Sequence, residues 1–226
     1  MNWVTRGFST TVGKKFVMAI TGLLLCGFLV FHLAGNLLMY VGPDVYNNYA
    51  HTLHAQGPLL ALAEIGLAVL FVVHICLAIS TTIENKRARK TSYATKASKI
   101  PERTLSIQNE SWMFISGAII LGFLLLHLSD FAFELRPDIN YEGLEPFEKA
   151  IAVLQTPLTI VGYGIGTIIL GVHLGHGVAS AFQSLGLTHP KYKSAIGWLG
   201  VAFAIVVALG FLSFALWGLN NLVSGT

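Results

Sequence analysis

Five stretches of the chain are apolar almost without interruption and are long enough to cross a lipid bilayer. They are residues 16–41, 58–83, 112–133, 157–183 and 195–219. A membrane-spanning helix needs about 20 apolar residues, and none of the five contains Lys or Arg, whose charge is costly in the bilayer. A backbone in lipid must satisfy its own hydrogen bonds, so each stretch is predicted to be a helix. The pattern predicts an all-α membrane protein with five transmembrane helices in a single membrane-anchor domain covering 1–226.

The segments between these stretches are short or polar. Residues 84–110 form a long basic loop, and residues 140–155 are predicted to start a short interfacial helix after Pro146. No internal repeat or low-complexity segment stands out, and no segment between the stretches is large enough to hold a catalytic core of its own.

Composition narrows the class of protein further. The 226-residue chain is 54% hydrophobic and 11% charged, whereas a soluble domain carries about 25% charged residues. This excludes a soluble globular enzyme and a nucleic-acid-binding protein. Cys26 and Cys76 lie inside apolar stretches and have no partner spaced for metal or redox chemistry, so both are interpreted as small buried apolar side chains.

The basic residues predict the orientation of the chain. If the five stretches cross the membrane, 12 of the 14 Lys and Arg residues lie on the side of the N-terminus: Arg6, Lys14, Lys15, Lys86, Arg87, Arg89, Lys90, Lys96, Lys99, Arg103, Lys191 and Lys193. The other side has only Arg136 and Lys149, beside six carboxylates. Because cytoplasmic loops carry the excess of Lys and Arg, we expect a cytoplasmic N-terminus and an external C-terminus.

Histidine is the candidate functional residue type. Of eight histidines, five lie in apolar stretches: His32, His74, His127, His173 and His176. Ionisable groups at membrane depth are rare and usually functional. Each histidine alone is explained as well by a hydrogen bond between helices. The set indicates a shared function, because each of the first four stretches carries at least one and the fifth carries none.

The depths of the histidines pair them. At a rise of 1.5 Å per residue, His32 and His127 lie about 14 and 9 Å below the outer ends of their helices. His74 and His173 each lie about 14 to 15 Å from the cytoplasmic side. His32 is therefore paired with His127, and His74 with His173, at two levels about 10 to 15 Å apart.

Two histidine pairs in a bundle formed by the first four helices predict two haems, each held between two imidazoles. A haem with two protein ligands has no open coordination position and transfers electrons. Zinc fits less well, because no level offers three or four close ligands. Glycines at 162, 164, 166, 171, 175 and 177, and Gly35 near His32, would make room for a flat macrocycle, or would serve close helix packing.

From the sequence alone, four further histidines are less certain as ligands of haem iron. His176 is three residues after His173 and therefore lies on nearly the same helix face, so it is an alternate ligand or a hydrogen-bond partner. His51, His54 and His189 lie between the apolar stretches, and we expect them to be solvated or to pair with haem propionates.

Several motifs resemble one known family. They are FHLAGNL around His32, YNNYAHTL, GPLLALAEIGLAVLFVVHICLAISTTIENKRARKTSY around His74, and GVHLGHGVASAFQSLG around His173. Together they are similar to the single-subunit, two-haem cytochrome b membrane anchor (b558 type) of succinate dehydrogenase/fumarate reductase. In that family one histidine from each of the first four helices ligates haem iron. The resemblance thus implies His32 and His127 for the outer haem and His74 and His173 for the inner haem, and it favours His173 over His176.

The resemblance also implies the partners and the location. A flavoprotein subunit with covalent FAD interconverts succinate and fumarate, a reaction of the tricarboxylic acid cycle, and an iron–sulfur subunit relays electrons to the inner haem. The anchor exchanges these electrons with a quinone, usually menaquinone. The basic loop with Lys191 and Lys193 would be the docking face. The chain would be a multi-pass protein of the bacterial cytoplasmic membrane, in contact with lipid, with no catalytic residue for dicarboxylate chemistry, and the complex could form a higher-order oligomer.

Glu64 and Asp130 are the two carboxylates clearly inside apolar stretches, and both are predicted near the outer haem. Quinone chemistry needs protons and electrons in one place, and a buried carboxyl can exchange protons. We therefore expect an outer quinone site with Glu64, and secondarily Asp130, as the proton-exchanging groups. An inner quinone site near Ser80, Thr81 or Gln183 is the alternative.

Two other functions remain open on the sequence. The chain could be the haem anchor of another quinone-linked complex, a hydrogenase or a formate dehydrogenase. It could also be a haem-free transporter with histidines and carboxylates as a proton relay, although such folds often show inverted repeats and broken helices.

Overall fold

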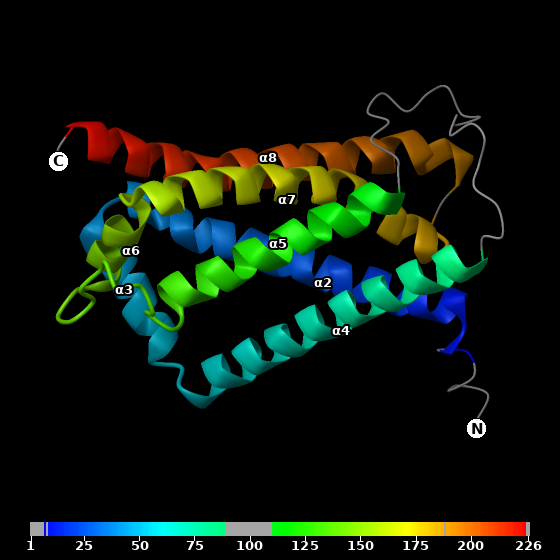
Figure 1. Cartoon of the computed structure of the whole chain (residues 1–226), viewed down its shortest axis with the longest axis horizontal. Helices are drawn as coiled ribbons and strands as arrows, with labels where there is room; N and C mark the ends of the chain where they lie inside the picture. The colour runs from blue at the N-terminus through cyan, green and yellow to red at the C-terminus, as the bar shows by residue number, and fades with distance from the viewer. Residues whose placement is uncertain (1–6, 8, 89–109, 188, 225–226) are drawn as a thin grey trace.

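A computed structural model describes residues 7, 9–88, 110–187 and 189–224, and the predicted all-α membrane fold is confirmed (Figure 1). Five helices are long and apolar enough to cross a membrane. The elements are α2 (Thr11–Leu37), the 3₁₀ turn η1 (Leu38–Tyr40), α3 (Pro43–His54), α4 (Pro58–Ala88), α5 (Glu110–Phe131), α6 (Pro146–Leu154), α7 (Pro157–Ser184) and α8 (Pro190–Ser224).

The long helices extend beyond several of the predicted apolar stretches. Helix α2 begins at Thr11, where the Thr10 side chain accepts a hydrogen bond from the backbone N–H of Gly13 (3.1 Å). Helix α4 continues to Ala88 and α8 starts at Pro190. Charged and polar residues can continue a helix once it leaves the hydrocarbon, so the hydropathy pattern marks the membrane-embedded part of each helix and not its full length.

Two short helices lie together at one end of the bundle (Figure 1). The predicted helix after Pro146 is confirmed as α6, whose start has a capping box between Glu145 and Glu148. Helix α3 was not predicted. The two helices are joined by hydrogen bonds from the Phe147 backbone N–H to Asn47 Oδ1 (2.8 Å) and between His51 Nε2 and Glu145 Oε2 (2.8 Å).

Helices α2, α7 and α8 form the best-packed part of the bundle. One cluster of buried side chains consists of Leu174, Ala204 and Val207, and another joins α2, α6 and α8. A β-carbon added at Gly171 would lie 2.7 Å from that of Ala208, and one at Gly175 would lie 3.6 Å from that of Ala204. These two glycines therefore allow close packing of α7 against α8.

Helix α4 lies at the edge of the bundle. None of the residues in its most apolar window is buried by the protein, and Leu62, Ile65 and Val69 are exposed. The predicted burial of Cys76 is wrong, because this side chain is exposed, while Cys26 is half-buried. The reason is that an apolar side chain in a membrane can face lipid as favourably as it faces protein.

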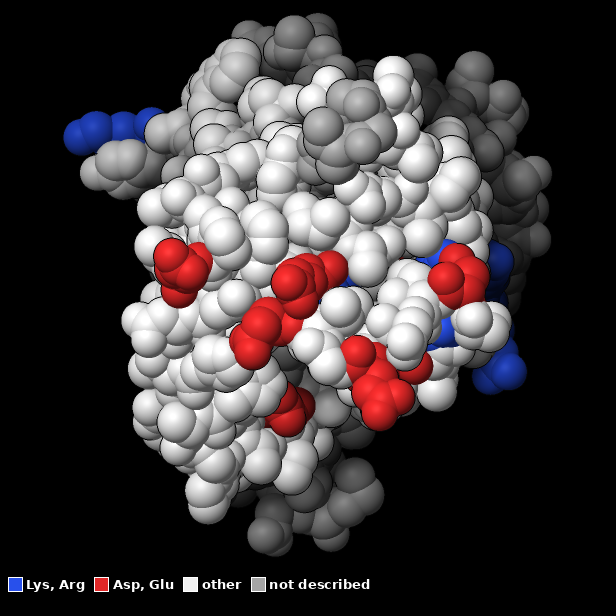
Figure 2. All heavy atoms as spheres, turned by 90° about the vertical axis from the view of Figure 1, so that its left-hand side faces the viewer, with Lys and Arg blue, Asp and Glu red and all other residues white. Residues whose placement is uncertain are grey.

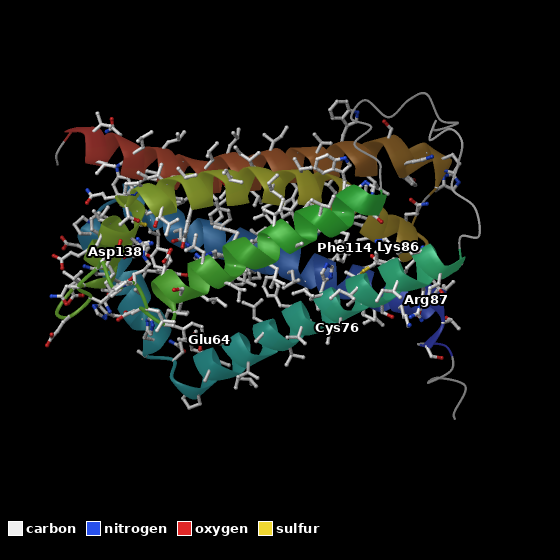
Figure 3. All side chains as sticks on the ribbon, viewed as in Figure 1. Glu64, Cys76, Lys86, Arg87, Phe114 and Asp138 are labelled. Atoms are coloured by element: carbon white, nitrogen blue, oxygen red, sulfur yellow. The ribbon has the colours of Figure 1, made fainter. Side chains whose placement is uncertain are left out.

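The charged residues divide between the two ends of the bundle. The end that carries α3 and α6 shows acidic side chains (Figure 2), and Lys86 and Arg87 lie at the opposite end (Figure 3). There, Lys14 of α2 forms an ion pair with Glu84 of α4, and Lys86 Nζ lies 5.9 Å from the centre of the Phe114 ring. Lys191 and Lys193 are exposed. Which end is cytoplasmic stays a prediction.

Several of the basic residues predicted on the side of the N-terminus, most of them in the predicted docking face, lie outside the described residues. They are Arg6, Arg89, Lys90, Lys96, Lys99 and Arg103.

Candidate functional site: two pairs of histidines in a four-helix frame

His32 of α2 and His127 of α5 face each other. Their ring centres lie 5.7 Å apart and their planes are nearly perpendicular, at 85°. Phe28 stacks on His32 with ring centres 5.1 Å apart, and Phe131 lies 5.3 Å from His127. The structure thus brings the two histidines of the predicted outer pair together inside an aromatic enclosure.

The spacing of this pair suits two ligands of a single metal ion. Imidazole nitrogens bound at about 2.0 Å on opposite sides of one ion bring their ring centres to roughly 6 Å apart. The observed separation of 5.7 Å is close to that value. The separation of the two rings is therefore compatible with the shared metal ligation that the sequence predicts.

The second pair is held by contacts with the other two long helices of the frame. His74 of α4 has its Nδ1 3.1 Å from Thr21 Oγ1 of α2, and a β-carbon at Gly22 would lie 3.1 Å from His74 Cε1. His173 of α7 has its Nδ1 2.9 Å from Ser116 Oγ of α5. The pairing of His74 with His173 stays a prediction.

These matching contacts reveal an internal repeat that the sequence analysis missed. Residues 21–33 are TGLLLCGFLVFHL, residues 116–128 are SGAIILGFLLLHL, and six of the thirteen positions are identical. In each stretch a hydroxyl residue followed by glycine stands eleven positions before the histidine. Eleven residues complete about three helical turns, so hydroxyl and histidine share one helix face. The conservative exchanges between Leu, Ile, Ala and Val hide the similarity.

The repeat continues through the second helix of each unit. Helices α4 and α7 both begin with proline, Pro58 and Pro157, and each carries its histidine sixteen residues later. A short helix that begins with proline, α3 or α6, precedes each of them. The two units run in the same direction along the bundle (Figure 1). The two histidines of each predicted pair therefore occupy equivalent positions in the two units.

Asp130 is the centre of a hydrogen-bonded group beside His127. Its side chain is fully buried, and the Tyr163 hydroxyl donates to Oδ2 (3.0 Å) while lying 3.2 Å from His127 Nδ1. Arg136 Nη1 lies 3.4 Å from Asp130 Oδ1. Sequence reasoning missed Arg136 as the partner of Asp130, because it assigned this arginine only to the outer loop.

Arg136 is itself held by a second carboxylate. Arg136 Nε donates to Asp138 Oδ1 (2.7 Å), and this contact raises the pKa of Arg136 while it lowers the pKa of Asp138. A carboxylate with a lowered pKa contributes its stabilisation above its unfolded pKa and loses it as the pH falls through the folded value. The pair is therefore intact at neutral pH.

Glu64 and Gly35 have different surroundings. Glu64 is exposed on the first half of α4, near the same end of the bundle as Asp138 (Figure 3). In the repeat it is equivalent to Tyr163, since both stand six residues after the helix-starting proline. A β-carbon at Gly35 would overlap the Tyr49 ring, so this glycine lets α3 pack on α2.

No protein-family model, no curated protein and no solved structure matches the chain.

Proposed function

We propose that the chain is the two-haem cytochrome b membrane anchor of a succinate:quinone oxidoreductase. It would pass electrons between an iron–sulfur subunit and a quinone, with menaquinone as the expected substrate. The observation that carries the proposal is the duplicated helix pair, which supplies four histidines as two equivalent pairs. A cofactor with two axial positions is the kind of ligand that two equivalent imidazoles from symmetric positions can hold.

In this proposal His32 and His127 hold one haem and His74 and His173 hold the other. Each bound haem would supply a one-electron carrier. The protein residues would fix the height of each carrier, exclude water with the Phe28 and Phe131 rings, and keep each imidazole in a fixed orientation. The flavoprotein with FAD and the iron–sulfur subunit would dock at the basic end, where Lys191 and Lys193 are exposed.

The haem content of the purified complex tests the proposal. We expect two haems b per chain and reduction of both by succinate. A colourless preparation would overturn the proposal and favour the haem-free transporter, since repeats that run in the same direction also occur in transporters. Two haems without succinate-linked reduction would instead indicate the anchor of a hydrogenase or a formate dehydrogenase.

Glu64 is our proposed proton-exchanging group for quinone. A carboxyl exposed to the side of an apolar helix is costly in lipid, which supports a polar ligand or water at this point. Asp130 is the weaker candidate, because both of its oxygens are already hydrogen-bonded or ion-paired, and this favours a structural role.

We expect Glu64→Gln to lower succinate:quinone activity by about 100-fold or more, the usual range for a lost acid–base group. Both haem spectra and succinate-linked dye reduction should be unchanged, because electrons still enter the chain. Glu142→Gln, an exposed carboxyl at the same end of the bundle, is the matched control and should keep full activity. Unchanged turnover with quinone in Glu64→Gln would disprove the assignment.

A further inference from the structure

The hydroxyl of Thr21 contacts both its own helix and His74. Thr21 Oγ1 lies 3.1 and 3.0 Å from the backbone carbonyl oxygens of Val17 and Met18, and 3.1 Å from His74 Nδ1. A hydroxyl has one hydrogen to donate and lone pairs to accept with. Carbonyl oxygens can only accept, so the hydroxyl hydrogen points to them and its oxygen accepts from Nδ1–H of His74, whose ring also has a hydrogen-bond partner in the backbone of Met18.

Ser116 makes the same arrangement with His173. Its Oγ lies 3.2 Å from the carbonyl oxygen of Met113 and 2.9 Å from His173 Nδ1. The serine hydroxyl therefore donates to its own backbone and accepts from Nδ1–H. A neutral imidazole with its hydrogen on Nδ1 keeps an unshared electron pair on Nε2, the atom that is then free to bind a metal.

We propose that Thr21 and Ser116 are positioning residues that hold His74 and His173 in this tautomer, so that the Nε2 atom of each would be free to bind the same haem. The inference rests on the proposed function. The internal repeat supports it independently, because the two hydroxyls occupy equivalent positions and act on equivalent histidines. Each hydroxyl acts from the helix that carries a histidine of the other pair.

In the His32–His127 pair, only His127 has a hydroxyl partner, and this partner is a tyrosine. The Tyr163 hydroxyl donates to Asp130 Oδ2 and accepts from His127 Nδ1–H. On His32, Asn36 Nδ2 lies 3.5 Å from Nδ1 and donates to the His32 backbone oxygen at 2.8 Å. The two haems should therefore respond to different sets of substitutions.

The test is a redox titration of both haems in the intact complex with Thr21→Val and Ser116→Ala. An acceptor on Nδ1–H makes an imidazole a stronger electron donor and stabilises ferric iron. Each variant should therefore raise the midpoint potential of the same haem and leave the other unchanged. A tenfold change in the ratio of ferric to ferrous binding corresponds to about 59 mV for one electron. Tyr163→Phe should instead shift the midpoint potential of the haem that His32 and His127 would hold.

Two further variants keep the test decisive. Thr82→Val is the control, because the Thr82 hydroxyl donates to the backbone carbonyl oxygen of Ala78 on its own helix (2.7 Å), and it should shift neither potential. If Thr21→Val loses one haem, Thr21→Ser should restore both the haem and its potential, because it keeps the hydroxyl. Restoration supports the proposal, and a failure of Thr21→Ser to restore the haem contradicts it.

The possible failures can be told apart. A wild-type complex without haem overturns the proposed function and this inference together. Two bound haems with unshifted potentials in Thr21→Val and Ser116→Ala overturn only the inference, and so do shifts that fall on different haems. The low-spin electron paramagnetic resonance signal of the affected haem should change in parallel, since its shape follows the orientation of the two imidazoles.

Discussion

Replacing His173 by alanine is expected to remove one of the two haems and to leave the other in place. The haem-to-polypeptide ratio should fall from two to one, and electron transfer from succinate to quinone should be lost. The physical reason is that alanine offers no lone pair to the iron, while the His32–His127 pair is held by separate contacts on α2 and α5. Quantitative absorption spectra of the purified complex measure both effects.

His176→Ala is the matched control for this prediction, since it lies three residues away on the same helix. We expect this variant to keep both haems. A loss of haem in His176→Ala together with two haems in His173→Ala would reverse the assignment of the ligand. Two haems in both variants would show that neither histidine is an iron ligand.

Arg136→Met is expected to lower the free energy of unfolding by about 3 to 5 kcal/mol, the usual cost of leaving one charge of a buried pair without its partner. The Asp130 side chain is fully buried and that of Arg136 is 9% exposed. Methionine keeps an apolar stem of similar length, so the loss reports on the charge and its hydrogen bonds. Denaturant unfolding in detergent, followed by circular dichroism, measures the change.

Lys149→Met provides the comparison, because Lys149 forms an ion pair with Glu134 (2.6 Å) in which both side chains are about one-third exposed. Such a pair contributes about 1 kcal/mol or less. If Arg136→Met cost no more than Lys149→Met, the Asp130–Arg136 contact would not be a stabilising buried pair.

The membrane architecture was predictable because it depends on composition over whole segments. Twenty apolar residues without a cation suffice to place a helix in lipid, so the five spans and the helix after Pro146 followed from the sequence. The pairing of His32 with His127 also came from counting residues along each helix. It requires only a fixed rise per residue and alternating directions.

The internal repeat was present in the sequence but was not recognised. Its identical positions are few, and the residues between them are interchangeable apolar types. The contacts of Thr21 with His74 and of Ser116 with His173 made the equivalence visible, because two matched hydrogen bonds identify which residues to align.

The sequence alone determined the number of helices able to cross a membrane, the position of each histidine along its helix and the types of residue able to bind a metal. Only the tertiary structure decided which side chains surround each imidazole, that Arg136 folds back onto Asp130, and that Cys76 and Glu64 are exposed. The reason is that lipid is as apolar as a protein interior, so hydropathy does not indicate which face of a membrane helix is turned inward. That rotation is set by contacts between distant parts of the chain.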